Sequence, residues 1–143
     1  MNGPRLLMAL LMAASIVAPA QQSAEHGLEN RWWRIAKYRA SGSDKGDQQD
    51  MIDAAKTAGI KFANGRIDGS PTCGGLYGTY RVSGDQLTVH AHLILRGFCP
   101  DEMMAQNQQV LNALNGDFRV EEKNDQIVLR DKSGQVRVLL VAR

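Results

Sequence analysis

The stretch from Gly59 to Pro100 constrains the fold most, because it alternates apolar and polar residues and is broken repeatedly by glycine-containing turns. A period of two with turns about every eight to twelve residues is typical of antiparallel strands that meander or curl. Asn64-Gly65 is a strong hairpin signal. Between Leu87 and Leu95 every second residue is apolar, which predicts a long half-buried strand. The stretch therefore predicts a continuous antiparallel sheet.

Two helices and further strands are predicted around this sheet. Asp47 can cap a helix over residues 47–58, and Gly59 suits its C-terminal end. A second helix begins at Cys99-Pro100 and ends at Asn115-Gly116. Its expected buried stripe is Met103, Met104, Val110, Leu111 and Leu114. Strands are expected over 31–38, 118–122, 126–130 and 136–141, with Trp33 and Ile35 facing the core and Trp32, Arg34, Ala36 and Tyr38 facing away from it.

This order of elements favours an α+β fold. Its sheet is expected to be strongly curved, or to form a small β-barrel, with one or two covering helices. Residues 1–20 have Arg5, an apolar run of about a dozen residues and an Ala18-Pro19-Ala20 site, which together are typical of a signal peptide. The run is short of the ~20 residues of a membrane span, although an uncleaved anchor is the alternative. Residues 21–30 are expected to be a flexible lead-in, and 31–143 a single domain.

The charge balance indicates which classes of partner the sequence argues against. The chain has 17 basic and 15 acidic residues, and the predicted signal peptide contains one arginine and no acidic residue, so the exported part is nearly neutral. Nucleic-acid binding depends on clustered lysines and arginines, and the sequence has no basic block. The sequence therefore predicts no nucleic-acid partner and, after signal cleavage, no stable membrane insertion.

The chain has two cysteines, Cys73 and Cys99. In an exported protein they are expected to form a disulfide, because the space outside the inner membrane is oxidising. The bond would close a loop of about 26 residues, which corresponds to about 3.5 kcal/mol of stabilisation. A redox-active pair is the alternative, but such pairs usually have the C-x-x-C spacing that lowers a thiol pKa.

With these features in view, the sequence resembles the META domain family, the HslJ-like proteins of bacterial envelopes. The resemblance spans about residues 31–142 and rests on short motifs. Three positions depart from the family pattern: Gly74 stands where an Asn is usual, Asn107 where an acidic residue is common, and Leu95 where a Thr is frequent. The matching positions are Trp33, Phe62, Gly65, Cys73, Gly78, Tyr80, Cys99 and Pro100.

Few residue patterns point to chemistry. His90 and His92 lie two apart on the polar face of a strand and could chelate zinc or copper if a third ligand converged, but a solvated strand face is the plainer interpretation. No fingerprint of a hydrolase, zinc protease or nucleotide-binding site is present. Trp32, Tyr38 and Tyr77 could form an exposed aromatic patch or be buried. The sequence therefore predicts no catalytic residue and no cofactor.

The resemblance implies an exported, periplasmic or secreted domain without a shared reaction, and some such proteins are associated with heat induction or antibiotic tolerance. The expected function is thus non-enzymatic: envelope stress tolerance through binding an envelope protein or small molecule, with the protein a monomer. The alternative is a secreted inhibitor of a lytic enzyme or protease that inserts a disulfide-stapled loop such as Gly69–Gly75 into the enzyme's cleft.

Overall fold

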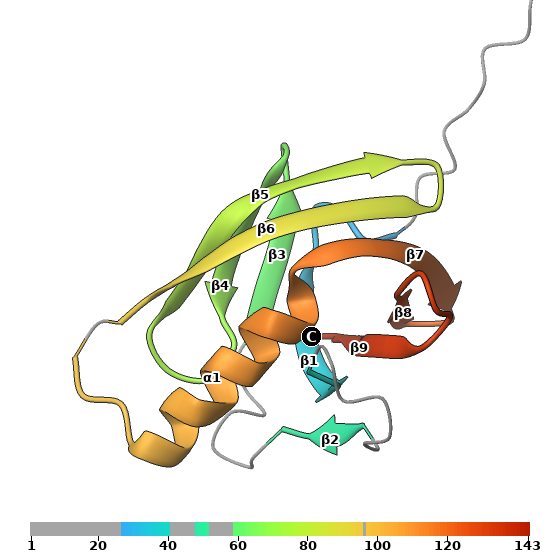
Figure 1. Ribbon diagram of the computed structural model, residues 1–143. Coiled ribbons are helices and arrows are strands. Elements are labelled where there is room, and N and C mark those ends of the chain that lie inside the picture. Colours follow the sequence, from blue (N-terminus) through green and yellow to red (C-terminus); the bar gives the residue numbers. More distant parts are fainter. Residues whose placement is uncertain (1–26, 41–47, 52–58, 96) are drawn as a thin grey trace, which may run out of the picture.

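The computed structural model describes residues 27–40, 48–51, 59–95 and 97–143. Within these ranges there are nine strands and one helix (Figure 1). The strands are β1 (Trp32–Tyr38), β2 (Gln49–Asp50), β3 (Gly59–Ala63), β4 (Arg66–Ser70), β5 (Gly75–Ser83), β6 (Gln86–Ile94), β7 (Gly116–Lys123), β8 (Gln126–Arg130) and β9 (Val136–Ala142), and the helix is α1 (Asp101–Leu114).

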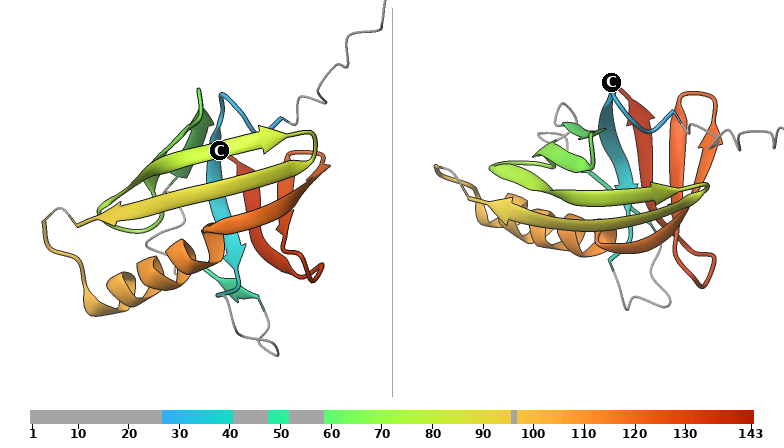
Figure 2. Two further views of the ribbon diagram at one scale, coloured as in Figure 1. Left: turned by 45° about the horizontal axis from the view of Figure 1, so that its top comes forward. Right: turned by 90° about the horizontal axis from the view of Figure 1, so that it is seen from above.

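All nine strands belong to one sheet with the order β2-β1-β3-β4-β5-β6-β7-β8-β9. Each neighbouring pair in this order is antiparallel, and β1 also pairs with β9. The sheet therefore curves round until its two ends meet, which gives the ring-like arrangement seen in Figure 2. The predicted α+β fold with a strongly curved antiparallel sheet is confirmed.

The prediction of a helix over residues 47–58 is wrong for the part of that segment that the structure describes. Gln49 and Asp50 instead form the short strand β2, which pairs with Lys37 and Tyr38 of β1. The Met51 amide also donates a hydrogen bond to β1, with 3.4 Å between its nitrogen and the Ala36 carbonyl oxygen. Backbone pairing with β1 therefore determines the structure of Gln49 and Asp50, and the few apolar residues that suggested a helix do not. Residues 52–58 of the prediction lie outside the described residues.

The core fills the inside of the ring. Trp33 and Ile35 point into it, as predicted, but Tyr38 does so too, with 3% of its surface exposed. The reason is a bulge in β1: Ile35 pairs with Leu140 and Lys37 with Leu139, so Ala36 is an extra residue. Because of this extra residue, the side chains of β1 that follow it point to the opposite side of the sheet from the one that simple alternation predicts. Other buried side chains come from every long strand, among them Ile60, Phe62, Ile67, Leu76, Leu87, Val89, Phe118, Ile127, Leu129 and Leu140.

Helix α1 packs against β6, β9 and β1 and so covers one side of the ring (Figures 1 and 2). Pro100 is its N-cap, and Asp101 and Glu102 lie in its first turn, where negative charge is favoured. Val110 and Leu114 are buried as predicted, but Met104 is 37% exposed. Within the described part of the chain, no helix has the length and apolar character needed to cross a membrane.

Residues 27–30, which fall in the expected lead-in, pack against the ring. Leu28 is fully buried, and its carbonyl accepts a 2.7 Å hydrogen bond from the Trp33 indole Nε1. The Asn30 amide donates to the Phe62 carbonyl at 2.7 Å, and Glu29 forms a parallel bridge with Phe62. The packed part of the chain therefore includes four residues before the expected start of the domain.

Candidate functional site

A disulfide joins Cys73 to Cys99, as predicted, with Cα atoms 6.0 Å apart. It links the segment between β4 and β5 to the segment that leads from β6 into α1. The Asn107 side chain of α1 reinforces this link, because its Nδ2 donates to the Cys73 carbonyl at 2.8 Å and Thr72 Oγ1 donates to its Oδ1. Two connections and the first half of α1 are thus fixed to one another at this end of the molecule.

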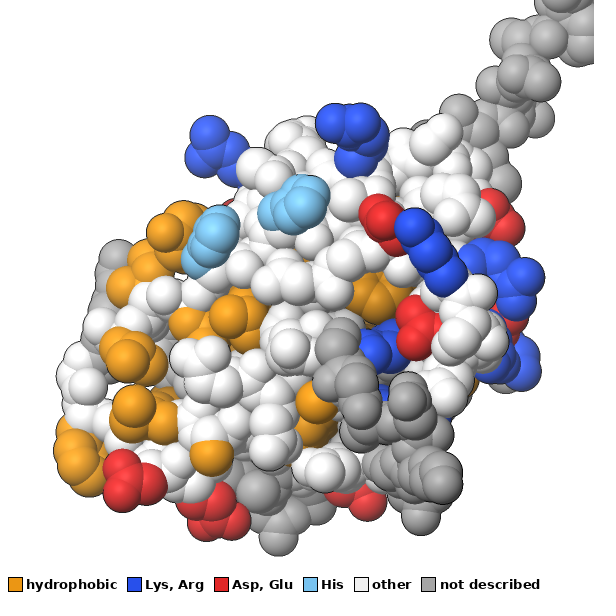
Figure 3. Space-filling view, viewed as in Figure 1, with side chains coloured by type: hydrophobic (Ala, Val, Ile, Leu, Met, Phe, Trp, Pro, Cys, Tyr) orange, Lys and Arg blue, Asp and Glu red, His pale blue; other side chains and the backbone are white. Residues whose placement is uncertain are grey.

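Three exposed apolar side chains lie in the β6–α1 connection and the first turn of α1. Phe98 is 92% exposed, Leu95 55% and Met104 37%; together these three residues form what we call the apolar tip. Leu95 was expected to continue the buried face of β6, but the strand ends at Ile94 and Leu95 faces solvent. Figure 3 shows hydrophobic side chains over the β6–α1 connection, with acidic side chains beside them. Contiguous exposed apolar surface commonly marks a contact surface, so the apolar tip is a candidate for one.

A groove with a volume of about 440 Å³ adjoins the disulfide-linked connections. Asp68, Gly69, Gly74, Gly75 and Tyr77 line it, together with Leu76 and Ile94. Tyr77 is 45% exposed, and its ring lies 5.8 Å, centroid to centroid, from the ring of His92 on the next strand. We call this feature the Tyr77 groove. It brings one of the predicted histidines together with the predicted aromatic residue.

His90 and His92 both lie on the exposed outer face of β6, as their alternation predicts. Their cross-strand neighbours on β5 are Thr79 and Tyr77, neither of which is a usual zinc ligand. Over the described ranges, no group of three or more His, Cys, Asp or Glu side chains lies close enough to hold a metal ion. The structure thus brings no third ligand to the two histidines from those ranges.

The three aromatic residues singled out in the sequence do not form one patch. Tyr38 is buried, and its hydroxyl lies 3.0 Å from both Gln49 Oε1 and Gln109 Oε1. Trp32 is 44% exposed but belongs to β1, three places from Tyr77's strand in the sheet order. Of the three, Tyr77 lines the groove described above.

The segment Gly69–Gly75, which the inhibitor hypothesis inserts into an enzyme cleft, is partly buried. Gly69 and Ser70 end β4, and Gly75 begins β5. Of the residues between them, Pro71 is buried, and Thr72, Cys73 and Gly74 are half-buried. The more exposed of the two disulfide-linked connections is the one that carries Phe98.

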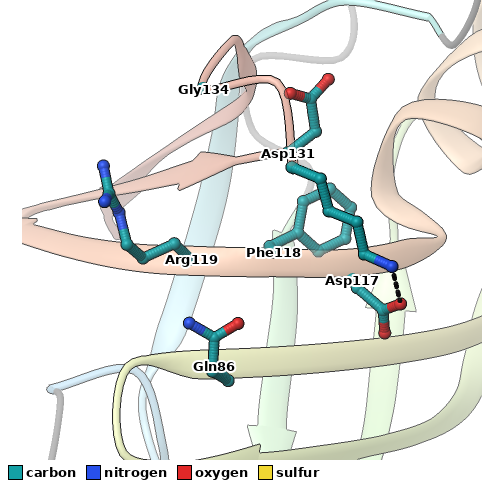
Figure 4. A pocket seen from close by; sticks show the side chains of 7 residues that line it. Gln86, Asp117, Phe118, Arg119, Asp131 and Gly134 are labelled. Carbon is teal, nitrogen blue, oxygen red and sulfur yellow. Dashed lines mark ion pairs between the residues drawn. The ribbon is translucent and has the colours of Figure 1, made fainter.

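A second pocket, of about 230 Å³, lies between β6, β7 and the β8–β9 turn (Figure 4). Its charged groups pair with each other, since Lys132 Nζ lies 3.6 Å from Asp117 Oδ2. A hydrogen bond from Thr88 and then the charge of Lys132 hold the pKa of Asp117 below its usual value. Burial raises the pKa of Asp131, but hydrogen bonds from Ser133 and Gln135 outweigh it, and the pKa is lowered. These contacts stabilise the β8–β9 turn and leave the pocket no unpaired carboxylate.

A model of the META domain family matches residues 26–143. The chain belongs to the META domain family. The fold of this META domain is similar to that of a protein from Burkholderia xenovorans solved by NMR, with a TM-score of 0.61, 14% identity and coverage of 95% of this chain and 99% of that one. A DUF4847-family crystal structure from Bacteroides vulgatus gives a TM-score of 0.53 at 14% identity, covering 81% and 94%. No curated protein matches the chain.

The motif residues of this META domain build its core. Trp33 and Phe62 are buried, and the Tyr80 ring packs edge-on against Phe62 at 5.2 Å between centroids. Gly65 has a φ of +76° in the β3–β4 turn, and its carbonyl accepts from the Tyr80 amide at 3.0 Å. A Cβ on Gly78 would lie 2.7 Å from Ala91 Cα, so only glycine lets β5 and β6 approach there. These positions therefore support the fold through core packing and close backbone approach.

Stability of the META domain should depend on the Tyr80 hydroxyl at high pH. Burial, and then a hydrogen bond to the Glu29 carboxylate, raise the pKa of Tyr80 from about 10 to about 12. Because the folded value is the higher one, the neutral phenol stabilises the fold fully below pH 10, and this contribution is lost as the pH rises toward 12. By pH 11 the loss should be about 1 kcal/mol.

The measurement is urea unfolding at pH 8 and pH 11 for the unmodified domain and for Tyr80→Phe. The variant should lose less stability between the two pH values, because it has no hydroxyl to ionise at position 80. An equal decline in both proteins would show that the Tyr80 phenol does not contribute this pH dependence.

Sequence reasoning located the disulfide, both histidines and Tyr77, but it missed Phe98 and the groove. Phe98 follows Gly97 in the segment just before the predicted helix, and no pattern there indicated whether its side chain would be exposed. One available signal was Leu95, an apolar residue close to the Gly97-containing connection. The groove was missed because Asp68 and Tyr77 come together only through the register of β4 and β5, and this register cannot be read from the sequence.

Proposed function

We propose that this META domain is exported and contributes to envelope stress tolerance by binding another envelope protein through the apolar tip. The observation that carries the proposal is Phe98, which is 92% exposed on a connection that the Cys73–Cys99 disulfide holds in place. Exposing a large aromatic side chain is unfavourable in water, and such residues are frequent binding hot spots. A residue beside a cross-linked cysteine also loses less conformational entropy on binding than one in an untethered segment.

The charges around the tip indicate the chemistry of the partner. Asp101 and Glu102 are exposed in the first turn of α1, directly after the connection that carries Phe98. No ion pair with a described residue involves either of them. A matching surface has an apolar pocket for Phe98 and basic groups at its rim, because complementary charge favours association and rejects other partners.

Export is supported by the signal-peptide pattern of residues 1–20 and by the disulfide, which persists in oxidising compartments. The stress role rests on membership of the META domain family, whose HslJ-like members the sequence resembles. The sequence has no fingerprint of a known catalytic motif, which supports a binding function. An inhibitor of a lytic enzyme is one kind of partner-binding protein, and a separate enzyme assay tests for it.

The test is survival of cells that lack the endogenous protein and carry either the unmodified domain or Phe98→Ser, under heat shock or an envelope-active antibiotic. We expect Phe98→Ser to fold normally, since an exposed residue contributes within about 0.5 kcal/mol, and to fail to restore survival. Trp32→Ser is the matched control, because Trp32 is an exposed aromatic residue on β1, and it should restore survival. Full restoration by Phe98→Ser would contradict the proposal.

A purified lysozyme and a serine protease, each assayed with the domain present, test the inhibitor function separately. Inhibition that Phe98→Ser removes would identify a lytic enzyme as the partner class. Inhibition that persists in Phe98→Ser would place the inhibitory contact elsewhere and contradict the role of the tip.

A further inference from the structure

We propose that the Tyr77 groove and the adjoining outer face of β4, β5 and β6 bind an acidic saccharide. The groove has a volume of about 440 Å³, within the size range of small-ligand sites. It opens beside the half-exposed Tyr77 ring. This site is separate from the partner-binding role of the apolar tip, because it involves different side chains on the sheet.

The register of the strands assembles the site from distant parts of the sequence. Asp68, Tyr77 and His92 are cross-strand partners in one row, and Arg66, Thr79 and His90 form the next row. Adjacent strands are ~4.8 Å apart and same-face residues along one strand ~7 Å apart. All six side chains therefore lie on one outward face, as their exposure confirms. Figure 3 shows the two histidines together with cationic side chains near them.

The Tyr77 row suits a sugar ring. An exposed aromatic face attracts the slightly positive C–H groups of a pyranose, as it attracts the edge of another ring. The Asp68 carboxylate is exposed, and no ion pair with a described residue involves it, so it can accept hydrogen bonds from sugar hydroxyls. Gly74 and Gly75 also line the groove and present no side chain to it.

The neighbouring cations select for an acidic substituent. Arg66 and Arg81 are both exposed, and neither forms an ion pair within the described part of the chain. They flank Thr79, one on the adjacent strand and one two residues along β5. Guanidinium groups bind carboxylates with paired hydrogen bonds. Asp117 on β7 is paired with Lys132. Asp68 lies one row from Arg66 on β4, so the acidic substituent is expected on the Arg81 side of the site, away from Asp68.

The experiment uses two sugars that differ by one carboxylate: N-acetylmuramic acid and N-acetylglucosamine. Amide chemical shifts of the full isotope-labelled chain are recorded as each sugar is added, in low-salt buffer. Both sugars should shift the amides of Asp68, Gly75 and Tyr77, and N-acetylmuramic acid should bind about five-fold or more tightly. Equal binding of the two sugars, or shifts confined to other parts of the domain, would overturn the proposal.

Variants separate the two halves of the site. Tyr77→Leu should weaken binding of both sugars about three- to tenfold, because it removes the aromatic face. Arg66→Gln with Arg81→Gln should weaken only N-acetylmuramic acid, by about five-fold. Lys123→Gln is the matched control for loss of an exposed cation and should change neither affinity. If the arginine variant retains the preference for the acidic sugar, the assignment of Arg66 and Arg81 is wrong.

Discussion

Replacing Trp33 with alanine is expected to lower the free energy of unfolding by about 4 kcal/mol. Trp33 is 1% exposed and is among the largest fully buried side chains in the ring. Its loss would leave a cavity that the surrounding strands cannot close, because β1 is held by β9 on one side and β3 on the other. It would also leave the buried Leu28 carbonyl without its 2.7 Å hydrogen bond from the indole.

Trp32→Ala is a closely matched control, since it removes the same side chain one residue earlier from a 44% exposed position. We expect it to cost less than about 1 kcal/mol. Trp33→Phe keeps much of the buried ring and should fall between the two, with a cost of about 2 kcal/mol from the lost hydrogen bond and reduced volume. Urea unfolding gives all three values. A Trp33→Ala cost no larger than that of Trp32→Ala would contradict the packing described here.

Removing the disulfide with Cys73→Ser and Cys99→Ser together is expected to lower the free energy of unfolding by about 3.5 kcal/mol. The two cysteines are 26 residues apart in sequence, and cross-linking them restricts the unfolded chain. The effect is large for a domain of this size, whose total stability is typically about 5–15 kcal/mol. The folded variant should keep its ring, because the strands on either side of the connections remain paired.

A reducing agent provides the internal control for this prediction. Adding dithiothreitol should destabilise the unmodified domain by the same amount and leave the double serine variant unchanged. If the variant is as stable as the oxidised protein, or if dithiothreitol affects both equally, the disulfide is not the stabilising link proposed for this end of the molecule.

Most of the sheet could be predicted from sequence because its signals are local. Alternation placed Leu87, Val89 and Ala91 inward and His90 and His92 outward, and the structure agrees. The predictions failed where long-range pairing decided the outcome. The extra residue Ala36 turns Tyr38 into the core, and it is visible only once β1 is aligned with β9.

The helix faces show the same limit. Met104 was expected in the buried stripe of α1, but Gln106 and Asn107 are buried instead. The Asn107 amide is accommodated because it hydrogen-bonds the Cys73 carbonyl, a contact between α1 and the β4–β5 connection that exists only in the folded chain. The apolar tip was missed for a related reason, since the place where β6 ends and the chain turns toward α1 determines that Leu95 and Phe98 face solvent.

The most direct test of partner binding at the apolar tip is photo-crosslinking in living cells with a photoreactive amino acid at position 98, compared with the same group at position 32. We expect a discrete adduct from position 98 alone. Excess unmodified domain should compete that adduct away, whereas excess Phe98→Ser domain should not. The same adducts from both positions, or competition by Phe98→Ser equal to that of the unmodified domain, would contradict binding at the apolar tip.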